Sequence, residues 1–109
     1  MTVSGTKYKV GAVIHSGFNQ LLPNFSVTKK IVVVDGKIER LYFILTELDT
    51  IGYCDHYHAY EICKPIIDHF HVCKQNEFAS FLPLHITKPF GDPHLFVCTK
   101  YDIDLYNFN

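Results

Sequence analysis

The sequence has no tryptophan and only three alanines among its 109 residues. Alanine is the strongest helix former, so its scarcity argues against a helical bundle. Phenylalanine and tyrosine are plentiful, with nine and seven copies, and these residues are enriched in strands. A chain of this length is the size of one domain. We therefore expect a single, mainly β domain.

The sequence also lacks a large excess of charge of either sign and any long apolar run. The formal net charge is -1, which argues against a strongly basic nucleic-acid arm or a polybasic membrane patch. No apolar run approaches the roughly 18 residues that a membrane span needs. Residues 1–6 are small and polar, unlike a signal peptide, and we expect them to be disordered or left from cloning. We accordingly expect an intracellular protein with reduced cysteines.

Alternating apolar residues and turn signals predict six to seven short strands. The expected strands are 7–14, 25–34, 37–47, 56–63, 68–74, 84–87 and 94–100. Asp35-Gly36 is expected to form a two-residue hairpin turn, because this pair accepts positive φ angles. The segments 15–24 and 48–55 are expected to be loops, and 75–81 is expected to be one helical turn or irregular. The pattern predicts a small antiparallel barrel or a strongly curled sheet over residues 7–109, with at most one short helix.

The segment from Cys54 to Cys73 holds four of the seven histidines and three of the four cysteines. If residues 58–73 closed as a hairpin around Pro65, His58 would approach Cys73. Imidazole and thiolate groups on one face could then hold a zinc ion. The candidate ligands are His56, His58, His71 and Cys73. No CxxC pair or established zinc spacing is present, and alternating histidines on a strand more often face solvent or flank a polar groove.

Tyrosines also gather near this segment. Aromatic side chains on small barrels can form cages for methylated lysine or stack on nucleobases. For any one tyrosine, a role in filling a core that has no tryptophan is favoured over a binding role, and the missing tryptophan weakens the cage interpretation. The candidate ligand-binding residues are Tyr42, His56, Tyr57, His58 and Tyr60.

Basic residues are concentrated near the start of the chain. Six of the ten lie in the first 40 residues, where Asp35 and Glu39 are the only acids. A basic N-terminal hairpin could contact phosphates, although lysines also protect the edges of ordinary solvated strands. The candidate nucleic-acid contacts are Lys7, Lys9, Lys29, Lys30 and Arg40.

Motifs for catalysis are absent from the sequence. It has no nucleophile elbow, no HExxH motif and no glycine-rich phosphate loop. A domain this small also has little room for a catalytic cleft beside its core. We therefore expect a protein that is not an enzyme and needs no cofactor.

Several segments resemble a domain of transposon-derived and uncharacterised animal proteins. They are 24–36, 41–44 and 55–62, and the most specific is the run His-Tyr-His-Ala-Tyr-Glu from His56 to Glu61. The family pattern often has glycine after the equivalent of Phe25, where this chain has Ser26. The layout is also similar to the SH3-like or bromo-adjacent-homology-like barrels of chromatin proteins. These resemblances imply a nuclear setting and an accessory, non-catalytic role.

Together these observations predict an intracellular interaction module that binds a histone tail or another protein segment. An aromatic groove or an exposed strand edge would form the contact, and the same edge could support a homodimer. A nucleic-acid-binding barrel and a zinc-stabilised domain are the two alternatives.

Overall fold

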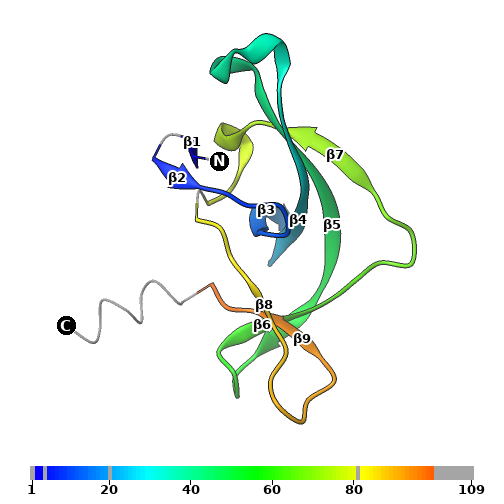
Figure 1. Cartoon of the computed structure of the whole chain (residues 1–109). Coiled ribbons are helices and arrows are strands. Elements are labelled where there is room, and N and C mark those ends of the chain that lie inside the picture. Colours follow the sequence, from blue (N-terminus) through cyan, green and yellow to red (C-terminus); the bar gives the residue numbers. More distant parts are fainter. Residues whose placement is uncertain (1, 4, 20, 81, 100–109) are drawn as a thin grey trace, which may run out of the picture.

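The computed structural model describes residues 2–3, 5–19, 21–80 and 82–99 (Figure 1). Its strands are β1 (Thr2–Val3), β2 (Thr6–Lys7), β3 (Val13–Asn19), β4 (Leu22–Val33), β5 (Leu41–Cys54), β6 (Ala59–Cys63), β7 (Phe70–Cys73), β8 (Ile86–Thr87) and β9 (Leu95–Val97). Three short 3-10 helices are η1 (Val34–Gly36), η2 (Ile38–Arg40) and η3 (Gln75–Glu77), and the described residues contain no α-helix. The prediction of a mainly β fold is confirmed. The last residue of the expected strand 94–100, and the rest of the expected domain to 109, lie outside the described residues.

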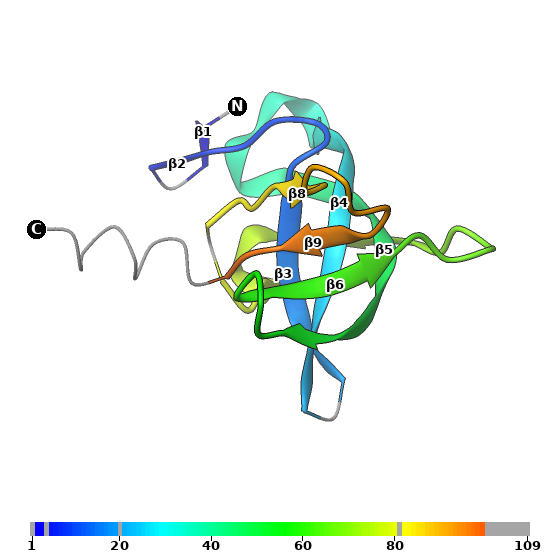
Figure 2. The ribbon, with the colours of Figure 1, turned by 90° about the horizontal axis from the view of Figure 1, so that it is seen from below.

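Seven of the strands form one antiparallel sheet, in the order β3-β4-β5-β6-β9-β8, with β7 paired to β5. The long strand β5 organises this sheet (Figures 1 and 2). Its first part pairs with β4 and, over 43–46, also with β7, whereas its last part pairs with β6. The strands β1 and β2 form a separate pair.

A bridge brings the two ends of this sheet together. Val13 in β3 exchanges two backbone hydrogen bonds with Leu84, which lies just ahead of β8. The ladders also shift register between His15 and Gly17, between Thr28 and Lys30, and between Thr50 and Gly52. Such bulges bend a strand and increase its twist, which allows β3 and the segment before β8 to meet.

Apolar side chains cover both faces of the β3–β4–β5 region. Neighbouring residues of a strand point to opposite faces, and Val13 and Ile14 accordingly belong to different core clusters. The first cluster contains Tyr8, Ile14, Leu41, Phe43, Leu45 and Phe78. The second contains Val13, Phe25, Leu48, Ile62 and Val97. A sheet buried on both faces shows no clean alternation of apolar and polar residues, so its register is not evident from the sequence alone.

The expected strand 7–14 is wrong in its centre, and the expected loop 15–24 is wrong over most of its length. Gly11 has a φ of 94°, and the N–H of Ala12 donates to the carbonyl of Lys9 at 3.1 Å. This turn ends β2 at Lys7, and β3 then runs through the region expected to be a loop. Pairing with β4 supplies the ladder bonds that outweigh the weak local strand signal there.

The Asp35-Gly36 prediction is partly confirmed. Both residues have positive φ, 56° and 67°, and Lys37 closes the turn by donating its N–H to Val34 at 3.1 Å. The connection is longer than two residues, however, because η2 follows before Leu41 pairs with Val33. Beyond it β5 continues to Cys54, so the expected loop 48–55 is wrong.

The expected hairpin around Pro65 does not form. Both β6 and β7 pair with β5, at successive levels of that strand, and not with each other. The length of β5 provides the physical reason, since it offers ladder positions to both strands.

Candidate functional site

The predicted ligand-binding residues fall into two groups. His56, Tyr57 and His58 lie in the turn between β5 and β6, and Tyr60 follows in β6. Tyr42 lies near the opposite end of β5, where it pairs with Val32 and Lys74 Nζ lies 5.4 Å from its ring centroid. The five residues therefore do not share one groove.

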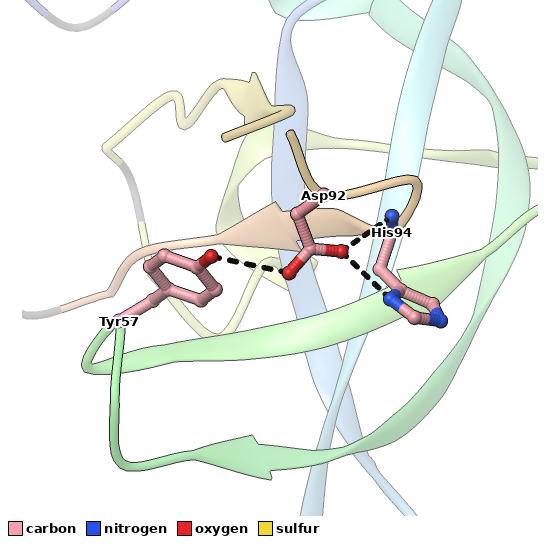
Figure 3. A network of polar contacts seen from close by, with 3 residues as sticks. All are labelled: Tyr57, Asp92 and His94. Atoms are coloured by element: carbon pink, nitrogen blue, oxygen red, sulfur yellow. Dashed lines mark hydrogen bonds and ion pairs between the residues drawn. The ribbon is translucent and has the colours of Figure 1, made fainter. Parts of the chain in front are cut away.

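Tyr57 belongs to a polar network at the β5–β6 turn (Figure 3). Its hydroxyl donates to Asp92 Oδ2 at 3.1 Å, and the backbone N–H of His94 donates to Asp92 Oδ1 at 2.9 Å. The ring nitrogen Nδ1 of His94 lies 2.7 Å from the same Oδ1. The Tyr57 ring also packs against Phe96, with centroids 4.8 Å apart. This network ties the turn to the loop that leads into β9.

The network shifts two pKa values in opposite directions. The hydrogen bond from the backbone N–H of His94, helped by the His94 ring and the Tyr57 hydroxyl, lowers the pKa of Asp92. Desolvation, together with the hydrogen bond to Asp92, raises the pKa of Tyr57. Near neutral pH the pair therefore consists of a carboxylate acceptor and a protonated phenol donor, and their hydrogen bond is maintained.

Tyr60 is half-buried and belongs largely to the core. Its ring lies 5.9 Å from that of Phe25 and 5.1 Å from that of Tyr53, and it packs against the second cluster. The Tyr60 ring therefore serves mainly to pack the core, which is the role favoured for any one tyrosine from the sequence.

The predicted metal ligands lie in different parts of the sheet. His56 and His58 are in the β5–β6 turn, whereas His71 and Cys73 lie in β7 opposite Leu45 and Phe43. Among the described residues, no three His, Cys, Asp or Glu side chains gather where they could hold a metal ion. Burial raises the pKa of Cys73 to about 11, with a smaller contribution from Glu77, and this disfavours the thiolate that zinc requires.

The clearest exposed feature is the strand β7. It pairs with β5 on one side, and within the part of the chain that the structure describes no strand pairs with its other side. Phe70 and Val72 lie on one face of β7 and are 63% and 61% exposed. An unpaired edge with exposed apolar side chains is unusual, because natural sheets normally protect such edges.

The ladder between β5 and β7 determines which backbone groups are free. The N–H of Glu47 donates to the carbonyl of His69 at 3.2 Å. Bonded and non-bonded pairs alternate along an antiparallel ladder, and the register places His71 and Cys73 in further bonded pairs. The N–H and C=O groups of Phe70 and Val72 therefore point away from β5, toward the open edge.

Two further apolar side chains continue this surface. Ile66 and Ile67, in the loop 64–69 between β6 and β7, are 103% and 68% exposed. The loop projects from the sheet next to β7 (Figures 1 and 2). We call Ile66, Ile67, Phe70 and Val72 the β7 surface.

The predicted basic contacts are dispersed. Arg40 forms an ion pair with Asp35 at 3.0 Å, so its charge is partly compensated. Lys29 and Lys30 are exposed at the β4 bulge. Lys7 and Lys9 lie beside a hollow formed with Pro83 and His85.

Sequence reasoning missed Phe70, Val72 and Asp92 as site residues. The alternation of Phe70 and Val72 with His69, His71 and Cys73 was visible, but which face stays exposed depends on pairing with β5. The contact between Tyr57 and Asp92 joins residues 35 positions apart and has no local signal.

Among the residues that the structure describes, no helix has the length and apolar character of a membrane span. Comparisons of the chain with models of protein families, with curated proteins and with solved structures gave no match.

Proposed function

We propose that this domain is a non-catalytic, barrel-like interaction module that binds an extended segment of a partner protein by strand addition to β7. One observation carries the proposal: β7 has an open edge, and Phe70 and Val72 are exposed beside it. In strand addition, backbone hydrogen bonds supply affinity and alternate side chains supply specificity. Both elements are available at this edge.

The side chains along the edge favour an apolar or aromatic partner segment. Val72 stands opposite Ile44 in a non-bonded pair of the ladder, where neighbouring side chains lie closest. A docked strand would place its own side chains beside Phe70 and Val72, and its flanking residues against Ile66 and Ile67. Such a segment could belong to a histone tail or to another partner protein in the nucleus.

A second copy of this chain is the competing occupant. Two copies of β7 would pair over only four residues, or about 13 Å of strand. A contact of this length buries much less surface than the roughly 1,200–2,000 Å² of a stable interface. A flexible peptide that also reaches the loop 64–69 can cover more of the β7 surface, so we favour a partner segment over a homodimer.

Proline at position 72 tests the proposal directly. In Val72→Pro the outward N–H is lost, whereas the bonds of His71 and Cys73 to β5 remain; proline is tolerated on an edge strand when its N–H would face solvent. Val72→Thr is the matched control, because it keeps the N–H and the branched shape. Short peptides selected from a random library on the wild-type domain provide the ligand.

We expect Val72→Pro to weaken peptide binding roughly tenfold or more, since a lost hydrogen bond and a blocked approach together cost at least about 1.4 kcal/mol. Val72→Thr should bind within about twofold of wild type. Equal binding by wild type and Val72→Pro would contradict the proposal. Sedimentation of the free domain as a dimer that Val72→Pro dissociates would show that a second copy occupies the edge.

A further inference from the structure

A second feature lies on a different part of the surface, between the β2–β3 connection and the segment before β8. It is a hollow of about 440 Å³, within the size range of small-molecule sites. The residues that line it are Lys7, Lys9, Val10, Gly11, Ala12, Pro83 and His85. The β7 surface shares none of these residues.

Backbone hydrogen bonds hold the two walls of this hollow in place. On one wall, the N–H of Gly11 donates to the carbonyl of Thr28 at 2.7 Å, and Thr28 donates its N–H to Ala12 at 2.9 Å. The walls are joined by Val13 and Leu84, whose two bonds measure 2.9 and 2.7 Å. A ligand would therefore enter a preformed site and would not have to order a loop, which is favourable for binding.

The described residues that line the hollow carry basic groups and no acidic one. The basic side chains are those of Lys7, Lys9 and His85. Among the described residues neither lysine forms an ion pair, since the ion pairs involve Arg40, His71 and His94. The remaining lining is mostly apolar, and Val10 at the tip of the turn is 67% exposed. The site thus combines free positive charge with an apolar wall.

We propose that this hollow binds a small organic anion, with its carboxylate or phosphate group near Lys7 and Lys9 and its apolar body against Val10 and Pro83. Charge-assisted hydrogen bonds from lysine are strong with either anionic group, and the imidazole of His85 offers a further N–H donor. The apolar wall would select an anion with a hydrocarbon body over a fully hydrated inorganic ion.

A nucleic-acid backbone fits these observations less well. It requires several uncompensated cations along a track, whereas Arg40 is paired with Asp35 and the whole chain has a net charge of -1. The concave shape and the apolar lining also suit a compact ligand better than a phosphate chain.

Nuclear magnetic resonance titration of the full chain can test the proposal. Phenylbutyrate and phenylbutyl phosphate carry both required parts, acetate carries only the charge, and phenylbutanol carries only the apolar body. We expect saturable shifts of the amides of Val10, Gly11 and His85 with the first two ligands, and affinities roughly tenfold weaker or unmeasurable with the other two.

Variants identify the side chains that bind the anion. The double variant Lys7→Gln/Lys9→Gln should lower the affinity for phenylbutyrate roughly tenfold. Lys64→Gln is the matched control, because Lys64 lies in the loop 64–69 on the opposite side of the molecule (Figures 1 and 2), and it should leave the affinity unchanged. The unchanged fold of each variant is verified from the rest of its amide spectrum.

Three results would overturn the proposal: no saturable shift at these amides, equal binding by the double variant, or equal binding of phenylbutanol and phenylbutyrate. Tighter binding of a single-stranded oligonucleotide, with shifts that extend to Lys29 and Lys30, would replace it with a nucleic-acid site. None of these outcomes depends on whether β7 binds a peptide.

Discussion

Val13 and Leu84 exchange two backbone hydrogen bonds, of 2.9 and 2.7 Å, although they lie far apart in the sequence. Val13 is fully buried in the second core cluster, and Leu84 packs against the same cluster. This bridge connects β3 to the segment that enters β8 and thereby unites the two ends of the sheet. The residues next to the bridge, Ala12, Pro83 and His85, line the hollow beside Lys7 and Lys9.

The bridge predicts a specific loss of stability. Leu84→Pro removes the N–H that donates to Val13 and leaves a buried carbonyl without its partner, which should lower the free energy of unfolding by about 1–3 kcal/mol. Leu84→Ala is the control, since it loses the side chain that packs against the second cluster but keeps the N–H that donates to Val13. Urea denaturation measures both variants, and equal stability of the two would contradict this role of the bridge.

Replacing a buried threonine whose hydroxyl has no partner should stabilise the fold. The hydroxyls of Thr28 and Thr46 have no hydrogen-bond partner among the described residues, and a buried unsatisfied polar group is costly. Thr28→Val keeps the shape and removes the hydroxyl, so it should raise the free energy of unfolding by about 1 kcal/mol. Thr50→Val should have the opposite effect, because the Thr50 hydroxyl donates to Pro23 at 2.7 Å. A destabilised Thr28→Val would show that its hydroxyl is satisfied.

The hydrogen bonds of Asp92 predict that the stability of the fold depends on pH. The pKa of Asp92 is lower in the folded chain than its ordinary value of 3.8, so its ionised form stabilises the fold. This contribution to stability is fully present above pH 3.8. It is lost as the pH falls through the pKa of Asp92 in the folded chain, which is lower than 3.8. The melting temperature of wild type should therefore exceed that of Asp92→Asn at pH 6, and the difference should disappear in strong acid.

An exposed aspartate in another loop serves as the reference for this measurement. Asp68→Asn changes the same charge in the loop 64–69 and should show a smaller pH-dependent difference from wild type. If the difference in melting temperature between wild type and Asp92→Asn stays constant from pH 6 to pH 2, the ionisation of Asp92 is not the source of the stabilisation.

Part of this fold was predictable from local signals. The strand 25–34 and the short strand 68–74 have continuous β-type composition, and the structure contains β4 and β7 there. The positive φ angles at Asp35 and Gly36 also follow from residue type. The β3 strand was not predictable, because its local strand signal is weak and pairing with β4 stabilises it. The full length of β5 was not predictable, because β5 pairs with β4, β6 and β7 along its length and the core covers both faces.

The candidate sites depend even more on pairing between distant segments. The sequence placed His71 and Cys73 beside His58, but β7 pairs with β5 and presents Phe70 and Val72 outward. Lys7 and Lys9 were recognised as basic residues, yet only the Val13–Leu84 bridge brings Pro83 and His85 opposite them. Composition indicates which groups are available, and the register of the sheet determines which of them meet.

Hydrogen exchange along β7 tests the central claim most directly. In the free domain we predict slow exchange of the His71 and Cys73 amides, which bond to β5, and fast exchange of the Phe70 and Val72 amides, which face the open edge. Saturation with a selected peptide should slow the exchange of Phe70 and Val72 as well. Protection of Phe70 and Val72 in the free domain, or unchanged exchange in the saturated complex, would contradict strand addition at β7.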